Sequence, residues 1–195
     1  MARLVLHFAP GASSMAPHIA LHETGAAFES RPVSFARGDN RTPGFLALNP
    51  EGRVPVLEID GAPLTEVAAI LYYLARAFPQ ARLAPWGDAV AEARVISWMS
   101  FIAASVHPAR RAGLDRAQHI WAMADSRLGA AEWAAGAYSV ADIHLFRLFW
   151  RFLNSLRPAP GAFPNLMRHY GAMMARDAVR RTLEAEAAIG YELPA

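Results

Sequence analysis

Hydrophobic and polar positions divide the chain into a first part that alternates strands with helices and a second part that is helical. Apolar runs compatible with β-structure lie at residues 3–8, 28–35 and 54–64. A helical pattern separates the first two runs and ends at Gly25, and another follows the third run to about residue 77. The predicted order is therefore strand, helix, strand, a turn-rich crossover, two strands and a helix.

The third apolar run contains a hairpin signal. Asp60-Gly61 is a preferred type I′ turn, and it stands between two short β-compatible segments. Thr65 is expected to cap the helix that follows the hairpin. The short apolar stretch that ends at Asn49-Pro50 is expected to be a turn.

A segment rich in proline and glycine separates the two parts. We expect an α/β domain at 1–78, a linker at 79–88 and an all-helical domain at 89–195. Within the last domain, apolar residues recur at helical spacing over 89–111, 114–127, 139–156 and 163–186. Ser139 and Asp142 have the spacing of a capping box at the start of one of these helices.

Composition excludes several chemistries. The 195 residues contain no Cys, and all 19 basic residues are Arg. The chain therefore has no disulfide, cysteine zinc site, catalytic thiol or P-loop lysine, and a cytoplasmic location is expected. Its net charge of +2 is spread along the chain and predicts no nucleic-acid partner, and the uncharged apolar run at 95–106 is too short to predict a membrane partner.

Two short motifs could bind a peptide-like ligand. A proline at a strand start, as in Val54-Pro55, suits a cis bond that would leave backbone groups of Val54 facing outward for an extended peptide. Glu66 stands at a helix start, where free N–H groups attract anions, so this position would suit an amino-acid zwitterion. The alternative is a plain N-cap with an acidic first turn, and the motif alone favours that explanation.

Other groups of residues could suggest a metal site or a hydrolase, but their spacing does not predict either. His18 and His22 have the i, i+4 spacing of zinc ligands, but the glutamate of an HExxH motif is missing, so no metal is expected. Ser13 and His107 could belong to a catalytic triad, yet the chain has no G-x-S-x-G motif. It has no G-x-G spacing either, so a dinucleotide-binding fold is not predicted.

Five stretches together resemble bacterial beta-class glutathione S-transferases. They occur in the order of that family over nearly the whole chain, at residues 8–21, 49–57, 64–66, 98–102 with His107, and 139–143. The resemblance implies a thioredoxin-like N-terminal domain, an all-helical C-terminal domain, and a homodimer that binds glutathione as co-substrate.

The resemblance also implies a set of glutathione contacts. Val54 would pair with the cysteinyl backbone of glutathione, and Glu66 with Val67 would hold the γ-glutamyl end. The implied glutathione-binding residues are Ala12, Arg37, Arg53, Val54, Pro55, Glu66, Val67 and His107. The implied acceptor site consists of Trp98, Phe101, Arg110 and Arg111.

The chain departs from the family pattern at the reactive position. Ser13 stands where the beta class has Cys, and Ser14 matches the serine that follows it. Delta- and theta-like relatives have their serine one position earlier, where this chain has Ala12. Val67 lacks a side-chain hydroxyl of the pattern, and Pro108 replaces a lysine.

These departures leave two hypotheses for function. In the first, Ser13, or Ser14, donates a hydrogen bond to the glutathione thiolate, which then attacks a small, largely apolar electrophile. In the second, the protein has a glutathione-transferase fold and binds glutathione with little or no turnover. A purely structural role for Ser13, as a helix cap, carries the same weight as a catalytic one.

Overall fold

The computed structural model describes residues 2–192, apart from the side chain of Arg110, and the chain divides into two compact units. The first unit takes the residues up to 81 and those from 177 onward, and the second takes 82–176. The C-terminal boundary differs from the expected one. The helical domain was expected to run from 89 to the end of the chain. The last helix of the chain, however, belongs to the first unit.

The first unit is built on a four-stranded sheet. Its strands lie in the order β2-β1-β3-β4, with β1 parallel to β2 and antiparallel to β3. The elements are β1 (Leu4–Phe8), α1 (Met15–Thr24), β2 (Glu29–Pro32), η1 (Asp39–Arg41), α2 (Pro43–Leu48), β3 (Val56–Ile59), β4 (Ala62–Thr65), α3 (Val67–Ala77), η2 (Pro79–Ala81) and α9 (Asp177–Ile189). This order confirms the predicted alternation of strands and helices.

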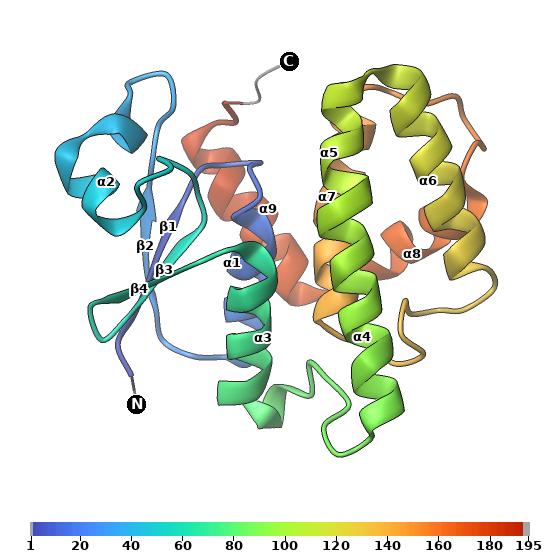
Figure 1. Cartoon of the computed structure of the whole chain (residues 1–195), viewed down its shortest axis with the longest axis horizontal. Coiled ribbons are helices and arrows are strands. Elements are labelled where there is room, and N and C mark those ends of the chain that lie inside the picture. Colours follow the sequence, from blue (N-terminus) through green and yellow to red (C-terminus); the bar gives the residue numbers. More distant parts are fainter. Residues whose placement is uncertain (1, 193–195) are drawn as a thin grey trace. The chain divides into compact units, whose positions relative to one another are not determined.

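Helices cover both faces of the sheet. Figure 1 shows α1 and α3 on one face and α2 on the other. Every residue of β1 is buried, as expected for a strand covered on both sides. On the α2 side, Phe45 packs in a cluster with Ala9, Val33, Val54 and Val56. The helix α2 therefore covers the strand ends that bear the residues of the candidate site.

Two local expectations about this unit were wrong. The stretch before Asn49 was expected to be a turn, but it forms the helix α2. The side chain of Thr42 accepts the N–H of Phe45 and so caps this helix, and Pro43 occupies its first turn. Thr65 was expected to cap α3, but it is the last residue of β4, where it pairs with Val56.

The hairpin has the predicted turn. Asp60 and Gly61 have φ angles of 51° and 86°, the two positive values that a type I′ turn requires. Glycine adopts such a conformation at no steric cost, and Asp tolerates it better than most residues.

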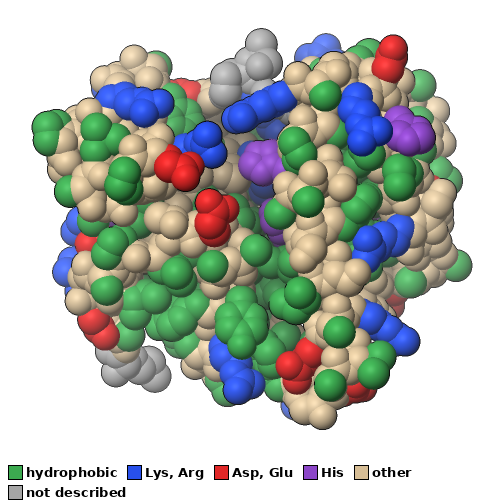
Figure 2. Space-filling model, in the orientation of Figure 1, with side chains coloured by type: hydrophobic (Ala, Val, Ile, Leu, Met, Phe, Trp, Pro, Cys, Tyr) green, Lys and Arg blue, Asp and Glu red, His purple; other side chains and the backbone are tan. Residues whose placement is uncertain are grey.

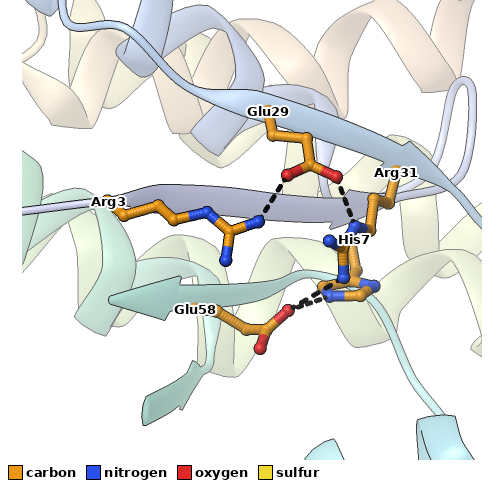
Figure 3. A network of polar contacts seen from close by, with 5 residues as sticks. All are labelled: Arg3, His7, Glu29, Arg31 and Glu58. Carbon is orange, nitrogen blue, oxygen red and sulfur yellow. Dashed lines mark hydrogen bonds and ion pairs between the residues drawn. The ribbon is translucent and has the colours of Figure 1, made fainter. Parts of the chain in front are cut away.

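Charged side chains of alternating sign link β2, β1 and β3. Glu29 accepts hydrogen bonds from Arg3 at 2.9 Å and from Arg31 at 2.6 Å. Glu58 lies 2.6 Å from Nε2 of His7 and 3.6 Å from Arg31 (Figure 3). Bonds from Arg31 and then Arg3 lower the pKa of Glu29. This network joins three neighbouring strands across the sheet.

A buried carboxylate fixes α9 to the start of α1. Glu186 accepts the N–H of Gly11 at 2.7 Å and lies 3.0 Å from Nδ1 of His18. The ring of His18 stacks on that of His22 with centroids 5.2 Å apart. Burial, followed by the charges of His18 and Arg181, lowers the pKa of His22 to about 4. These contacts explain why α9 belongs to the first unit.

The second unit is helical and centred on α7. Its elements are α4 (Ala89–Phe101), the π-helical η3 (Ile102–Val106), α5 (His107–Ala109), η4 (Arg110–Ala112), α6 (Leu114–Leu128), α7 (Val140–Ser155) and α8 (Pro164–Met174). The predicted pattern at 163–186 is thus two helices, α8 and α9, which lie in different units. The helical pattern expected over 89–111 is divided among α4, the π-helical turn η3, α5 and η4.

The capping box predicted at the start of α7 is present. The side chain of Ser139 accepts the N–H of Ala141, and Asp142 accepts the N–H of Ser139 at 2.9 Å. Asp142 also accepts the N–H of Ala134 at 2.7 Å and lies 3.0 Å from Nε2 of His169. Because α7 is buried from Val140 to Phe152, this box anchors the central helix of the unit.

Candidate active site

The two serines between β1 and α1 have different surroundings. Ser14 is fully buried, and its Oγ lies 3.1 Å from the backbone nitrogen of Ala9 and 3.2 Å from its carbonyl oxygen. Ser13 is half-buried, and its hydroxyl donates to the carbonyl oxygen of Val54 at 2.9 Å. Ser14 thus bonds to Ala9 within its own loop, whereas the hydroxyl of Ser13 bonds to Val54, the residue before Pro55.

The segment that carries Val54 is held by side-chain amides. Nδ2 of Asn40 donates to the carbonyl of Gly52 at 2.7 Å, and Nδ2 of Asn49 donates to that of Arg53 at 2.8 Å. Gly52 has a φ of +64°, and a Cβ there would come within 2.8 Å of the carbonyl oxygen of Asn40. Only glycine fits this close approach.

The peptide bond between Val54 and Pro55 is cis, as the sequence allowed. Both residues are buried. The carbonyl of Val54 was expected to face outward without a partner, but it accepts the hydroxyl of Ser13. Ala12, half-buried beside the α2 core cluster, completes the loop on the other side of Ser13.

Glu66 marks the start of α3. It is exposed and has a φ of 69°, which is uncommon for glutamate, and strained backbone positions of this kind cluster at functional sites. The helix begins with Val67, so the first-turn N–H groups and the positive end of the helix dipole lie beside this carboxylate. The arrangement offers an acceptor for an ammonium group and donors for a carboxylate.

The two arginines that the resemblance assigns to glutathione are exposed and ion-paired. Arg37 lies 2.8 Å from Asp39, and Arg53 lies 3.1 Å from Glu51. A backbone hydrogen bond from Ser34, followed by the bond from Arg37, lowers the pKa of Asp39. A ligand carboxylate at either arginine would therefore compete with a carboxylate of the chain.

In the second unit, Trp98 and Phe101 form one aromatic group. Their ring centroids lie 6.0 Å apart, and the guanidinium of Arg127 lies 4.5 Å from the first ring and 4.9 Å from the second. Trp98 is only 4% exposed, whereas Phe101 is half-buried. Phe101 therefore offers more surface to a ligand than Trp98 does.

The other predicted residues of this unit lie near the π-helical turn η3. His107 follows it directly and is exposed, as is Arg111. The side chain of Arg110 lies outside the described residues. π-Helical turns are frequent at functional sites, so the position of His107 is consistent with the predicted contact.

Sequence reasoning missed one feature of α7. His144, Arg147 and Arg151 follow one another at spacings of three and four residues, which places them on one face of this helix. They are 4%, 6% and 5% exposed. The sequence does carry a signal for this feature, namely basic residues at helical spacing within a strongly apolar helix. A search for apolar periodicity alone does not detect it.

Metal ligands do not gather in the part of the chain that the structure describes. No group of three or more His, Asp or Glu side chains there could hold a metal ion. The i, i+4 pair of His18 and His22 is instead a ring stack beside Glu186.

Comparison with known families agrees with this geometry. Residues 3–76 match the N-terminal domain of glutathione S-transferases, and residues 98–177 match the C-terminal domain. The chain belongs to the glutathione S-transferase family. The sheet unit is accordingly the thioredoxin-like domain of a glutathione S-transferase, and the helical unit is its C-terminal domain.

Individual relatives support this assignment. Glutathione S-transferase GST-4.5 of Xanthomonas campestris pv. campestris is 32% identical over 162 residues, covering 72% of this chain and 78% of that protein. Glutathione S-transferase GstA of Escherichia coli O157:H7 is 30% identical over 202 residues, covering 90% and 92%. A sphingomonad glutathione S-transferase solved with glutathione has a TM-score of 0.85 and 35% identity, covering 94% of this chain and 98% of that one.

Proposed function

We propose that this glutathione S-transferase conjugates glutathione to a small electrophile and that Ser13 stabilises the glutathione thiolate. The observation that carries the proposal is the hydrogen bond from the half-buried hydroxyl of Ser13 to the carbonyl of Val54, at 2.9 Å. This bond supports the catalytic role of Ser13, because the hydroxyl lies next to the backbone groups of Val54, to which we assign the cysteinyl part of glutathione. The other serine, Ser14, is buried and bonded to Ala9, which favours Ser13 for the catalytic role.

Binding of glutathione would change the partner of the Ser13 hydroxyl. If the cysteinyl N–H of glutathione donates to the carbonyl of Val54, it competes with Ser13 for the same oxygen. A serine hydroxyl rotates about its C–O bond, so it can turn from the carbonyl to the sulfur. A hydrogen bond donated to the charged form of the thiol lowers the pKa of that thiol.

The γ-glutamyl end is assigned to the start of α3. The carboxylate of Glu66 suits the ammonium group, and the first-turn N–H groups from Val67 onward suit the α-carboxylate. Arg37 and Arg53 supply positive charge for the remaining carboxylate, which would exchange with Asp39 or Glu51. Together with Val54, these contacts account for both ends and the centre of the tripeptide.

The reaction proposed is a substitution at an activated carbon. The thiol of glutathione loses its proton to solvent, and the thiolate sulfur attacks the carbon that bears a halide. The C–S bond forms, the C–halide bond breaks, and the halide leaves with the electron pair of that bond. Because Ser13 has no thiol, a mixed disulfide between this residue and glutathione cannot form.

The acceptor is assigned to side chains of the helical unit. Phe101 offers an apolar surface, and His107 and Arg111 offer polar contacts at exposed positions. The ring of Trp98 packs edge-to-face against that of Phe101, and the guanidinium of Arg127 lies over the Phe101 ring. Removing reactive electrophiles in the cytoplasm would make this a detoxifying enzyme.

We assign the exposed apolar side chains of α3, and separately those of α4, to contacts with a second copy in a homodimer. Figure 2 shows hydrophobic side chains gathered over the region where α3 lies, and Tyr72 of that helix is 49% exposed. The helical segment Ala89–Ala109 is long and apolar enough to span a membrane by length and composition, yet only 28% of its most apolar window is buried. Exposed apolar surface of this kind supports contact with a second copy. Sedimentation of the purified protein as a monomer at assay concentrations would refute the assignment.

A conjugation assay combined with calorimetry tests the proposed function. We expect purified protein to bind glutathione and to accelerate its reaction with 1-chloro-2,4-dinitrobenzene above the uncatalysed rate. Glutathione binding without turnover of aryl halides, epoxides or enones would favour the binding-protein hypothesis. If glutathione does not bind, both hypotheses fail.

A further inference from the structure

The carboxylate of Glu192, which follows α9 in the first unit, binds the loop after β2. Its Oε1 accepts the hydroxyl of Ser34 at 2.5 Å, and its Oε2 accepts the N–H of Ala36 at 3.1 Å. Both oxygens therefore contact residues 34–37, a stretch that we call the 34–37 turn. This contact has no role in the reaction proposed above.

The 34–37 turn offers several donors to one carboxylate. The N–H groups of Phe35 and Ala36 are successive, and successive backbone N–H groups in a turn form a site for anions. The hydroxyl of Ser34 accepts the N–H of Arg37 at 3.1 Å, which leaves its own proton for a ligand oxygen. The bonds from Ser34 and then Ala36 lower the pKa of Glu192. The N–H of Phe35 and the charge of Arg37 lower it further, so the side chain binds as a carboxylate.

Two carboxylates of the described residues contact this turn, and they differ in origin. Asp39 lies 2.8 Å from the exposed Arg37 and accepts the N–H of Ser34 at 2.9 Å, so its bonds are made within the loop itself. Glu192 comes from a segment more than a hundred residues away and is partly exposed. It can therefore leave the turn while the loop keeps its internal bonds.

The 34–37 turn lies at the same edge of the sheet as the loop that carries Ser13. The strands β1 and β2 are parallel, and their last residues are paired. The loops that follow them therefore leave the sheet at one edge, which is where ligands bind in open α/β sheets. Phe35 of the turn and Ala12 of the other loop pack against the same core cluster, which contains Val54. The turn is thus a neighbour of the position assigned to the cysteinyl part of glutathione.

We propose that Glu192 is an internal competitor for glutathione: its carboxylate occupies the 34–37 turn in the free protein, and the glycyl carboxylate of glutathione displaces it. The proposal rests on the glutathione binding proposed above and adds what limits that binding. The glycyl residue directly follows the cysteinyl residue, so a sulfur beside Ser13 brings the glycyl carboxylate to the neighbouring loop. Both carboxylates need the same donors, and only one binds at a time. The apparent affinity for glutathione is then reduced by the fraction of molecules in which the turn is occupied.

Glutathione and its glycyl monoethyl ester test this competition. They share the thiol, the cysteinyl backbone and the γ-glutamyl end, and they differ in one carboxylate. Calorimetry with the natural protein and with Glu192→Ala gives four dissociation constants. We expect Glu192→Ala to bind glutathione roughly tenfold more tightly, which corresponds to a turn that Glu192 occupies about nine-tenths of the time. The ester should bind both proteins with equal affinity to within about twofold, because it gains nothing from an open turn.

Two further variants serve as controls. Glu184→Ala removes the same charge from an exposed position of α9 and should leave the affinity for glutathione within about twofold of the natural value. Glu192→Gln keeps an acceptor oxygen without the charge and should give an intermediate gain. Unchanged or weaker binding of glutathione by Glu192→Ala would overturn the proposal. So would an equal gain for the ester or for Glu184→Ala, because the loss of negative charge alone would then explain the result.

Displacement is also measurable in the natural protein. NMR of the side-chain carboxyl carbon of Glu192 gives its pKa in the free protein, with saturating glutathione and with the ester. We expect glutathione to raise this pKa toward its ordinary value of about 4.5, because the bonds from Ser34 and Ala36 are lost. The ester should leave it unchanged. If the pKa stays low in the glutathione complex, Glu192 has not left the turn and the proposal is wrong.

These measurements follow binding alone, so they separate this proposal from the proposed reaction. If glutathione displaces Glu192 but no electrophile is conjugated, the transferase mechanism fails and the competition stands. If conjugation proceeds while Glu192 keeps its pKa and Glu192→Ala keeps the natural affinity, the competition alone fails. If neither protein binds glutathione, both fail.

Discussion

Charged side chains are arranged differently in the two units. Across the sheet, each acid lies between bases, as Glu29 does between Arg3 and Arg31 (Figure 3). On the face of α7, the three titratable side chains are all basic and more deeply buried. Opposite charges satisfy one another and hold elements of the fold together, whereas burial, followed by the charges of Arg147 and His107, holds His144 neutral by lowering its pKa to about 3. The difference indicates that the first arrangement stabilises the fold through opposite charges, whereas the second makes stability sensitive to acid.

The largest effect should come from the buried acid of the first unit. Glu186→Ala removes the acceptor of the Gly11 N–H and leaves His18 buried without its carboxylate. Breaking a buried pair in this way costs about 3–5 kcal/mol, so we expect the free energy of unfolding in urea to fall by that amount.

A neighbouring acid of the same helix provides the control. Glu184 is exposed on α9, and Glu184→Ala should change the free energy of unfolding by no more than about 0.5 kcal/mol. If the two variants are equally stable, the buried contacts of Glu186 do not hold α9 to the first unit.

A smaller and pH-dependent effect should come from His144, which is buried in α7. The pKa of His144 is about 3 in the folded protein, below its ordinary value of 6.5. The unfolded chain therefore takes up a proton at higher pH than the folded chain. Stability is lost as the pH falls from about 6.5 toward 3, by up to about 1.4 kcal/mol per unit.

Replacing the ring should remove this dependence. His144→Phe is expected to change the free energy of unfolding by about 1 kcal/mol or less at pH 7, in the stabilising direction, because it removes a buried polar atom without a partner. At pH 4 the natural protein should have lost roughly 2–3 kcal/mol more than the variant. Parallel urea titrations at the two pH values measure the difference. Identical losses would show that His144 is not held neutral by burial and its basic neighbours.

The sequence was sufficient where a local rule determines the structure. Asp60-Gly61 formed the expected turn, and Ser139 with Asp142 formed the expected capping box. In each case the residues that decide the outcome lie within four positions of one another. The order of strands and helices in the first unit followed from the same kind of local pattern.

The sequence was insufficient where a contact between residues far apart in the chain determines the structure. Nothing local separates α9 from α8 or attaches it to the first unit, because its anchor is the bond from Glu186 to a loop 175 residues earlier. The helix α2 is short, and burial of Phe45 against the sheet adds to its cap. The different surroundings of Ser13 and Ser14 likewise depend on Val54, 41 residues from the first of them. The buried basic side chains of α7 were overlooked because apolar residues dominate that helix.

The pKa of the glutathione thiol in the complex tests the central claim most directly. It is measured from the ultraviolet absorbance of the thiolate as a function of pH, in the natural protein, in Ser13→Ala and in Ser13→Thr, which keeps a hydroxyl. We predict a pKa well below the ordinary thiol value of about 8.5 in the natural protein and in Ser13→Thr, and a value about one unit higher in Ser13→Ala. The same pKa in all three proteins would contradict the claim that the Ser13 hydroxyl stabilises the thiolate.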